Sequence, residues 1–444
     1  MSSLRPEHRL LLAALSPQPA EDRAAEIREL AQARLDWAYV VDAAARLGTL
    51  ALLGSAAAQA GAELPPAVAG RCRQAHHLSA ARALLAERSL GRIARSFRQA
   101  EIPLLVLKGV PLALEAYGDP GLRPVGDLDI LVHRRDRDRG LKALAGLGYA
   151  PAHGSLPLSF YRRHHFHAAL VRIGEEKLPV ELHWDTHPPF SLGWVPEQEL
   201  WAGATRIQLD GESVRIPGLG ENLLLLAQHL WRHTLGTGAG GAADPVEWLL
   251  SPALQGRLIW VADLALLARR HDVDWPRLQA RVQRWGLDSE WQAAADLLRR
   301  HGPVPGLPLP GQTSFRPTPS RGPTAATLAG RFPSLGRASA RLQLRPVLAV
   351  EALRYAIPGT AWIRRRYGLE GAASARILTR TVSHAAGAGL KFTFMGLEAL
   401  AGMARTQLEK LFTPMGNCQN RILYAKLRTQ HTATNQVSRS ASEE

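Results

Sequence analysis

Apolar residues recur at helical spacing at both ends of a central region. From Pro19 to about Ala100 the chain is rich in Ala, Leu, Arg and Glu, and its helical period breaks at Glu63–Pro66. After Pro217 the helical period returns in four stretches, at 221–233, 256–270, 274–286 and 289–301. The pattern predicts two groups of helices around a central region of different character.

The central region has the pattern of extended chain. EIPLLVL (101–107) is a short apolar run, and DLDILVH (127–133) alternates acidic with apolar residues before a charged helix. HFHAALVRI (165–173) and LPVELHW (178–184) follow, with Gly174–Glu176 between them as a hairpin turn. These stretches predict an α+β fold, in which a small mixed sheet has helices on one side and helical subdomains beside it.

The length implies several units, because single hydrophobic cores stop growing at roughly 250–300 residues and this chain has 444. Pro, Gly, Ser and Thr dominate 303–324, which is typical of a surface linker. The expected order is an N-terminal helical region (1–95), the mixed core (96–217), a helical subdomain (218–302), a Pro- and Gly-rich linker (303–340), a C-terminal helical region (341–412) and a polar, disordered tail (413–444).

Positive charge is concentrated at the C-terminal end. Residues 303–444 hold 19 Lys and Arg against 6 Asp and Glu, a net charge of +13 out of +15 for the whole chain. An anionic partner, such as nucleic acid or a membrane surface, would therefore meet the C-terminal region.

The sequence carries no sign of export or membrane insertion. Cys72 and Cys418 match neither a disulfide framework nor a zinc spacing. The apolar run after His8-Arg9 is only six residues, shorter than the apolar core of a signal peptide. No stretch reaches the roughly 18 uncharged apolar residues of a membrane-spanning helix. We expect a cytoplasmic protein without a transmembrane segment.

Three carboxylates are the strongest candidates for chemistry. Asp127 and Asp129 are one residue apart in an expected strand, so both project from one face. Close like charges are unfavourable unless a cation neutralises them, and such oxygen ligands suit Mg²⁺ or Mn²⁺. Glu181 lies in the apolar run LPVELHW, where an unpaired buried charge is costly. An acid-x-acid pair alone is common on solvated strand edges, but together the three acids predict a two-metal site for phosphoryl chemistry.

Basic and glycine residues near the acids are candidate phosphate ligands. Lys108-Gly109 follows the first extended run directly, and would offer a cation and an exposed backbone amide to phosphates. Arg123 precedes the acidic pair and is a candidate second phosphate clamp.

Histidines gather in the same region, at 164, 165, 167, 183 and 187. A zinc site on the His-x-x-x-His of HWDTH is disfavoured, because Pro188-Pro189 follow and the preceding residues are extended, whereas such a pair needs a helix. His183 shares the face of Glu181 and is a weaker candidate for positioning substrate or water.

Two polar residues inside apolar helices, His229 and Asp263, are further weak candidates. A buried polar pair or a helix-packing contact is the favoured interpretation of both.

A family resemblance rests on these stretches. LLVLKGVPLALEAYGDPGLRPVGDLDILVHRRD, then GLGYAP, VELHWDTH, AQHLWRH and RLIWVADLALLA resemble the bacterial family of uncharacterised nucleotidyltransferases within the DNA polymerase beta-like superfamily. The similarity runs from the N-terminal helices to about residue 270, and 303–444 lie outside it.

The resemblance implies a role for each candidate. Asp127 and Asp129 match the family's metal-binding acid pair, and Glu181 its third acid. Lys108 with Gly109 matches the phosphate-loop position, although the wider superfamily has Gly-Ser there and a shorter interval before the acids. Arg123 matches a recurring basic residue, and both His229 and Asp263 fall at recurring positions.

The expected function is Mg²⁺- or Mn²⁺-dependent transfer of a nucleotidyl group, AMP foremost, from a nucleoside triphosphate (NTP) such as ATP. The expected acceptor is a hydroxyl group. The fold alone does not say whether that hydroxyl belongs to a small molecule, a peptide or a protein. The rival is a non-catalytic binding protein that keeps the nucleotidyltransferase-like fold and uses its basic C-terminal region to hold a partner.

Overall fold

The protein is described by a computed structural model at residues 4–151, 158–172, 178–187, 193–233, 250, 257–270, 272–300, 304, 306 and 307. The predicted hairpin turn at Gly174–Glu176, all but three residues of the predicted linker and both predicted units beyond residue 340 lie outside this part.

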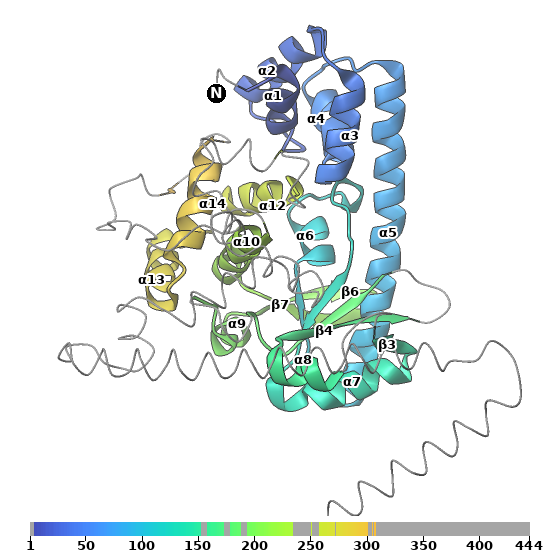
Figure 1. Cartoon of the computed structure of the whole chain (residues 1–444), viewed down its shortest axis with the longest axis vertical. Helices are drawn as coiled ribbons and strands as arrows, with labels where there is room; N and C mark the ends of the chain where they lie inside the picture. Colours follow the sequence, from blue (N-terminus) through green and yellow to red (C-terminus); the bar gives the residue numbers. More distant parts are fainter. Residues whose placement is uncertain are drawn as a thin grey trace, which may run out of the picture.

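Helices occupy both ends of the described chain, and the strands lie between them (Figure 1). The helices are α1 (Pro6–Ala13), α2 (Glu21–Gln32), α3 (Trp37–Leu47), α4 (Leu50–Gln59), α5 (Pro66–Gln99), α6 (Gly109–Glu115), α7 (Arg137–Gly146), α8 (Leu158–His164), α9 (Glu197–Ala202), α10 (Leu219–His233), α12 (Ile259–Ala268), α13 (Trp275–Trp285) and α14 (Asp288–Arg300), with short 3-10 turns η1 (Pro120–Leu122) and η2 (Arg134–Asp136). The strands are β1 (Leu105–Leu107), β2 (Leu128–Leu131), β3 (Tyr149–Pro151), β4 (His167–Arg172), β5 (Val180–His183), β6 (Thr205–Leu209) and β7 (Glu212–Ile216).

Local signals explain where several helices begin and end. The side chain of Asp36 accepts a hydrogen bond from the backbone of Tyr39 at the start of α3, and Asp274 caps α13 in the same way. Both helices end at a glycine with left-handed backbone, Gly48 and Gly286. The four helices predicted after Pro217 are present as α10, α12, α13 and α14.

The strands form one mixed sheet in the order β3-β4-β5-β2-β1-β7-β6. The fold is α+β, as the sequence predicts, but in the part of the chain that the structure describes the sheet has seven strands, where the sequence pattern indicated four. The strands that the pattern missed are β3, β6 and β7. Two of them form a hairpin around Asp210-Gly211, whose positive φ angles of 48° and 76° suit a tight turn between twisted strands.

Each face of the sheet packs differently. Val106, Leu128, Ile130, Val180 and Leu182 belong to a core that also includes residues of α5 and α7. Among the described residues, the opposite face contributes Leu105, Leu107 and Leu131 to a second core, and the polar side chains described below lie on this face at β2 and β5. Helices therefore cover both sides of the sheet, not one side as the sequence pattern suggested.

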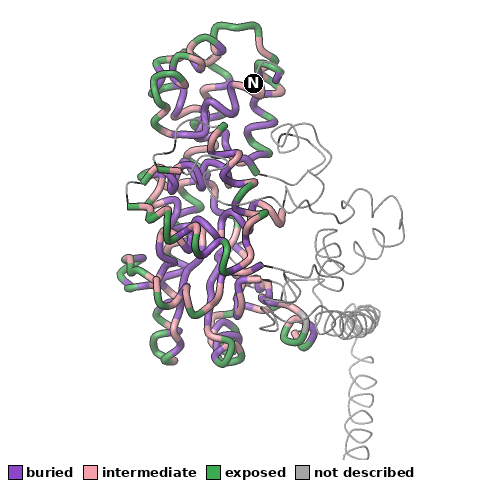
Figure 2. Tube along the Cα trace, turned by 90° about the vertical axis from the view of Figure 1, so that its left-hand side faces the viewer, coloured by how far each residue is buried: buried purple, intermediate pink, exposed green. Residues whose placement is uncertain are grey.

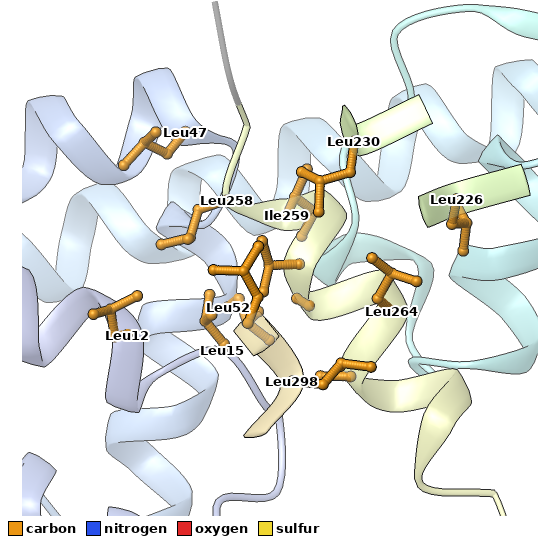
Figure 3. Packing of buried hydrophobic residues seen from close by; sticks show 14 of the residues in the cluster. Leu12, Leu15, Leu47, Leu52, Leu226, Leu230, Leu258, Ile259, Leu264 and Leu298 are labelled. Carbon is orange, nitrogen blue, oxygen red and sulfur yellow. The ribbon is translucent and has the colours of Figure 1, made fainter. Parts of the chain in front are cut away.

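The second core joins the two ends of the described chain. Figure 3 shows Leu12 and Leu52 of the N-terminal helices beside Ile259, Leu264 and Leu298 of the helices that follow the sheet. Buried positions occur from the N-terminal helices through the rest of the described chain (Figure 2), and the same core includes Leu105 and Leu131 of the sheet. The N-terminal helices and the helices after the sheet thus share one hydrophobic core.

Among the described helices, none is by itself long and apolar enough to cross a membrane. One pair, α3 with α4, passes that test together on length and composition, with a bend of 117° between the two helices.

Candidate active site

The pairing of β2 with β5 brings the three acids together. The two strands are parallel, and their register sets Asp129 directly beside Glu181. Asp127 lies one residue before β2. Ligand oxygens of the three carboxylates all lie within 4.8 Å of one another. Asp129 is buried, with 2% of its surface exposed, whereas the side chain of Glu181 is 28% exposed and remains accessible from solvent.

Lys108 reaches the same cluster from the neighbouring strand. Leu107, the last residue of β1, lies opposite Asp129 in the antiparallel register, so the following turn meets the start of β2. The Nζ of Lys108 is 3.0 Å from Oδ2 of Asp129. Lys108 and Gly109 have φ angles of 47° and 54°. With a ψ angle of −148°, Lys108 lies in a sparsely populated backbone region that costs on the order of 1–3 kcal/mol, and such strain concentrates at functional sites.

Arg123 contacts three protein groups near the cluster. Its Nε and one terminal nitrogen each donate to Asp263 at 2.8 Å, and its other terminal nitrogen donates to the carbonyl oxygen of Gly109 at 3.3 Å. Tyr117 also donates to Asp263, at 2.8 Å. All of these groups are buried. Arg123 therefore ties the Lys108-Gly109 turn to α12, and direct phosphate contact by Arg123 stays a prediction.

The weaker histidine candidates both contact the cluster. Nε2 of His183 is 3.1 Å from Oδ1 of Asp129 and 3.5 Å from Oε2 of Glu181. Nδ1 of His229, on α10, is 3.4 Å from Nζ of Lys108. The structure thus brings Lys108, His183 and His229 to the three acids on one face of the sheet, with Asp263 held one step away behind Arg123.

The carboxylates are not equivalent. Burial raises the pKa of Asp127 to about 6, and the charge of Asp129 adds to the rise. Burial also opposes ionisation of Asp129, but the charge of Lys108 and the hydrogen bond with His183 hold its pKa below the usual value. Burial is likewise outweighed at Glu181, where His183 and Lys108 lower the pKa to about 2. Of the three acids, Asp127 is the one whose ionised form is stabilised least by its surroundings.

The surroundings of the two basic side chains, Lys108 and His183, favour their charged forms. Burial would discharge Lys108, but Asp129, Asp127 and Glu181 together raise its pKa. Burial acts on His183 in the same direction, and its hydrogen bonds with Asp129 and Glu181 outweigh it and raise the pKa. Three carboxylates thus lie beside two basic side chains, and the charge of Arg123 also acts on Asp127.

This donor set fits a divalent cation. All three acids offer oxygen atoms, the ligand that Mg²⁺ and Mn²⁺ prefer. Burial and the neighbouring charge of Asp129 both raise the pKa of Asp127, and a bound cation would stabilise its ionised form. Asp127, Asp129 and Glu181 are therefore the residues that would hold metal.

The model of a protein family described as "Uncharacterised nucleotidyltransferase" matches residues 33–302. The chain belongs to this family. The matched range contains all the residues of the acidic cluster, as well as His229 and Asp263. Membership of this nucleotidyltransferase family supports nucleotidyl transfer as the general reaction.

Other comparisons add little. No curated protein matches the chain. One solved structure that matches is the crystal structure of an antigenic nucleotidyltransferase-like protein from Paracoccidioides brasiliensis. The alignment is 14% identical, covers 48% of this chain and 92% of that one, and has a TM-score of 0.26, which is too low to support an argument.

One neighbour of the cluster was not selected from the sequence. Nε2 of His167, on β4, lies 3.7 Å from Oε2 of Glu181. His167 was visible as part of the histidine group, but its place depends on the antiparallel register of β4 with β5, which sets it opposite His183. The start of HFHAALVRI, where Phe166 separates His165 from His167, was the available signal, because alternation places both histidines on one face.

Proposed function

We propose that the protein transfers a nucleotidyl group, AMP from ATP, to a hydroxyl-bearing acceptor. The observation that carries the proposal is the cluster of three carboxylates within 4.8 Å beside the Lys108-Gly109 turn, in a chain of a nucleotidyltransferase family. In such a reaction the acceptor oxygen bonds to the α-phosphorus, pyrophosphate leaves, and the acceptor hydroxyl loses its proton.

The acids have one task in this proposal, which is to hold divalent cations. Asp127, Asp129 and Glu181 would bind Mg²⁺ or Mn²⁺, and the bound ions supply activation of the acceptor hydroxyl and neutralisation of the triphosphate charge. Because Asp127 and Asp129 come from one short segment and Glu181 from the adjacent strand, the sheet itself keeps the three carboxylates in position.

The Lys108-Gly109 turn would hold the triphosphate. Lys108 already balances one acid through its contact of 3.0 Å with Asp129, and it can exchange that partner for a phosphate oxygen. Gly109 lets the backbone approach the phosphates closely. His229 lies 3.4 Å from Nζ and restricts where Lys108 can point. Arg123 would act through the turn, by holding the carbonyl of Gly109.

Nucleotide labelling is the direct test of the proposal. With ATP labelled at the α-phosphate, cell extract and Mg²⁺, we expect a small molecule, peptide or protein in the extract to acquire label. Label at the γ-phosphate should not be transferred. Chelation of metal should abolish labelling, and protein carrying Asp127→Asn is the matched control. If α-labelled ATP transfers no label, and neither do GTP, CTP and UTP labelled in the same way, the proposal is contradicted.

Lys108→Met is expected to weaken binding of ATP in the presence of Mg²⁺ by about 10- to 100-fold, because a hydrogen bond to a charged group contributes on the order of 1.5–3 kcal/mol. Calorimetry measures the dissociation constant. Lys142→Met is the control, since Lys142 is exposed on α7. Unchanged affinity for ATP in Lys108→Met would show that Lys108 does not contribute to phosphate binding.

The same calorimetry tests the rival binding function. That function is favoured if the native protein binds no nucleotide but binds nucleic acid or anionic lipid with an affinity that depends on salt.

A further inference from the structure

Two histidines on neighbouring strands converge on one oxygen of Glu181. His167 of β4 lies opposite His183 of β5 in the antiparallel register, so both rings project from the same face of the sheet. The ring centroids are 4.7 Å apart. The Nε2 atoms of the two rings lie 3.7 Å and 3.5 Å from Oε2 of Glu181.

We infer that His167, Glu181 and His183 form a second cation site, specific for a nitrogen-preferring divalent ion such as Zn²⁺ or Co²⁺. One ligand atom from each residue lies within 4.8 Å of the others. A tetrahedral ion with bonds of about 2.0–2.1 Å holds its ligand atoms about 3.4 Å apart, close to the separations seen here. Imidazole nitrogen suits Zn²⁺, Co²⁺ and Fe²⁺, whereas carboxylate-only sites suit Mg²⁺.

Nε2 of His167 is the ring atom that would bind the ion. It lies 3.7 Å from Oε2 of Glu181, and the side chain is 18% exposed, so an ion can reach the ring from solvent. A neutral imidazole binds metal through one nitrogen and carries its proton on the other, so Nδ1 would hold the proton.

The new site differs from the carboxylate site in donor chemistry and shares one ligand with it. Glu181 belongs to both groups of ligand atoms, and shared carboxylates are common where two ions lie roughly 3.5–4 Å apart. The inferred binding does not depend on any reaction. Its part in catalysis rests on the proposed function: the ion beside Glu181 would be the one that meets the acceptor, so this chain would use two different metals.

Cobalt spectroscopy tests the site without measuring activity. The full-length protein is saturated with Mg²⁺ and titrated with Co²⁺, whose visible absorption is much stronger with four or five ligands than with six. We expect a strong band in the native protein. His167→Ala should lose that band and bind Zn²⁺ at least about tenfold more weakly, while its affinity for Mg²⁺ stays unchanged. His77→Ala is the matched control, because His77 is exposed on α5.

The outcomes separate this site from the proposed function. An unchanged cobalt band and zinc affinity in His167→Ala would overturn the site even if Mg²⁺-dependent transfer is observed. A His167-dependent band in a protein that transfers no nucleotide would support the site and overturn only its catalytic role. His167→Gln keeps a polar side chain of similar size and replaces the alanine variant in the same assay if that variant does not fold. A native protein without a strong band would also overturn the site.

Discussion

Asp127→Asn is expected to abolish metal-dependent nucleotidyl transfer and, at the same time, to make the metal-free protein more stable. The variant keeps the size of the side chain but removes a charged metal ligand, so activity should fall by about a thousandfold or more. The gain in stability comes from the same charge. Burial and the neighbouring Asp129 raise the pKa of Asp127 to about 6 from an ordinary value of 3.8, so the folded protein resists its ionisation.

The pH dependence of that gain follows from the sign of the shift. A carboxyl whose pKa is raised by folding destabilises the fold once it ionises, as pH rises through about 6. Without metal, Asp127→Asn should therefore raise the free energy of unfolding at pH 8 by on the order of 1–3 kcal/mol. The difference should vanish near pH 4. Added Mg²⁺ should stabilise the native protein and leave the variant unchanged.

Thermal unfolding with chelator and with Mg²⁺ measures these effects, alongside the α-label assay. Asp42→Asn is the control, because Asp42 is exposed on α3. A variant that keeps full activity would refute the metal-ligand role of Asp127. A variant that is inactive but less stable at pH 8 would show that Asp127 is balanced by contacts other than those described.

Asp263→Ala is expected to destabilise the protein by about 3–5 kcal/mol, because it leaves the buried charge of Arg123 without its partner. Asp263 is fully buried and accepts hydrogen bonds from both Arg123 and Tyr117. The thermal midpoint should fall by roughly 2–4 °C for each kcal/mol lost. By comparison, Asp272→Ala should cost no more than about 1 kcal/mol, because its ion pair with Arg270 is largely exposed.

A double variant separates stability from function. Arg123→Met with Asp263→Leu removes both charges, and we expect it to recover most of the stability lost in Asp263→Ala. It should still bind ATP more weakly than the native protein, because the carbonyl of Gly109 has lost its hydrogen bond from Arg123. Native affinity for ATP in the double variant would show that the turn needs no support from Arg123.

The acidic cluster could be predicted because its signal is local. Asp127, Asp129 and Glu181 stand out as charges in otherwise apolar extended stretches, and the alternation of a strand fixes which face each side chain takes. His183 was placed on the face of Glu181 by the same rule. The helices at both ends could also be predicted, since their apolar period and capping residues lie within the segments themselves.

The remaining features depend on pairings between distant segments. Arg123 and Asp263 are 140 residues apart, and no local pattern indicates which acid would accept the guanidinium. The position of His167 depends on the register between β4 and β5. The β6–β7 hairpin was missed because its strands are polar on the exposed side, although Asp210-Gly211 is a strong turn signal.

The bond between Arg123 and Asp263 also bears on how the chain could be shortened. A fragment that ends at Pro217 would contain all seven described strands and all three acids, yet it would lack α10 and α12, which carry His229 and Asp263. Arg123, beside the Lys108-Gly109 turn, would then lack its partner Asp263. Leu105, Leu107 and Leu131 would lose apolar contacts with the helices of the second core. The smallest autonomous unit therefore extends through the helices that follow the sheet.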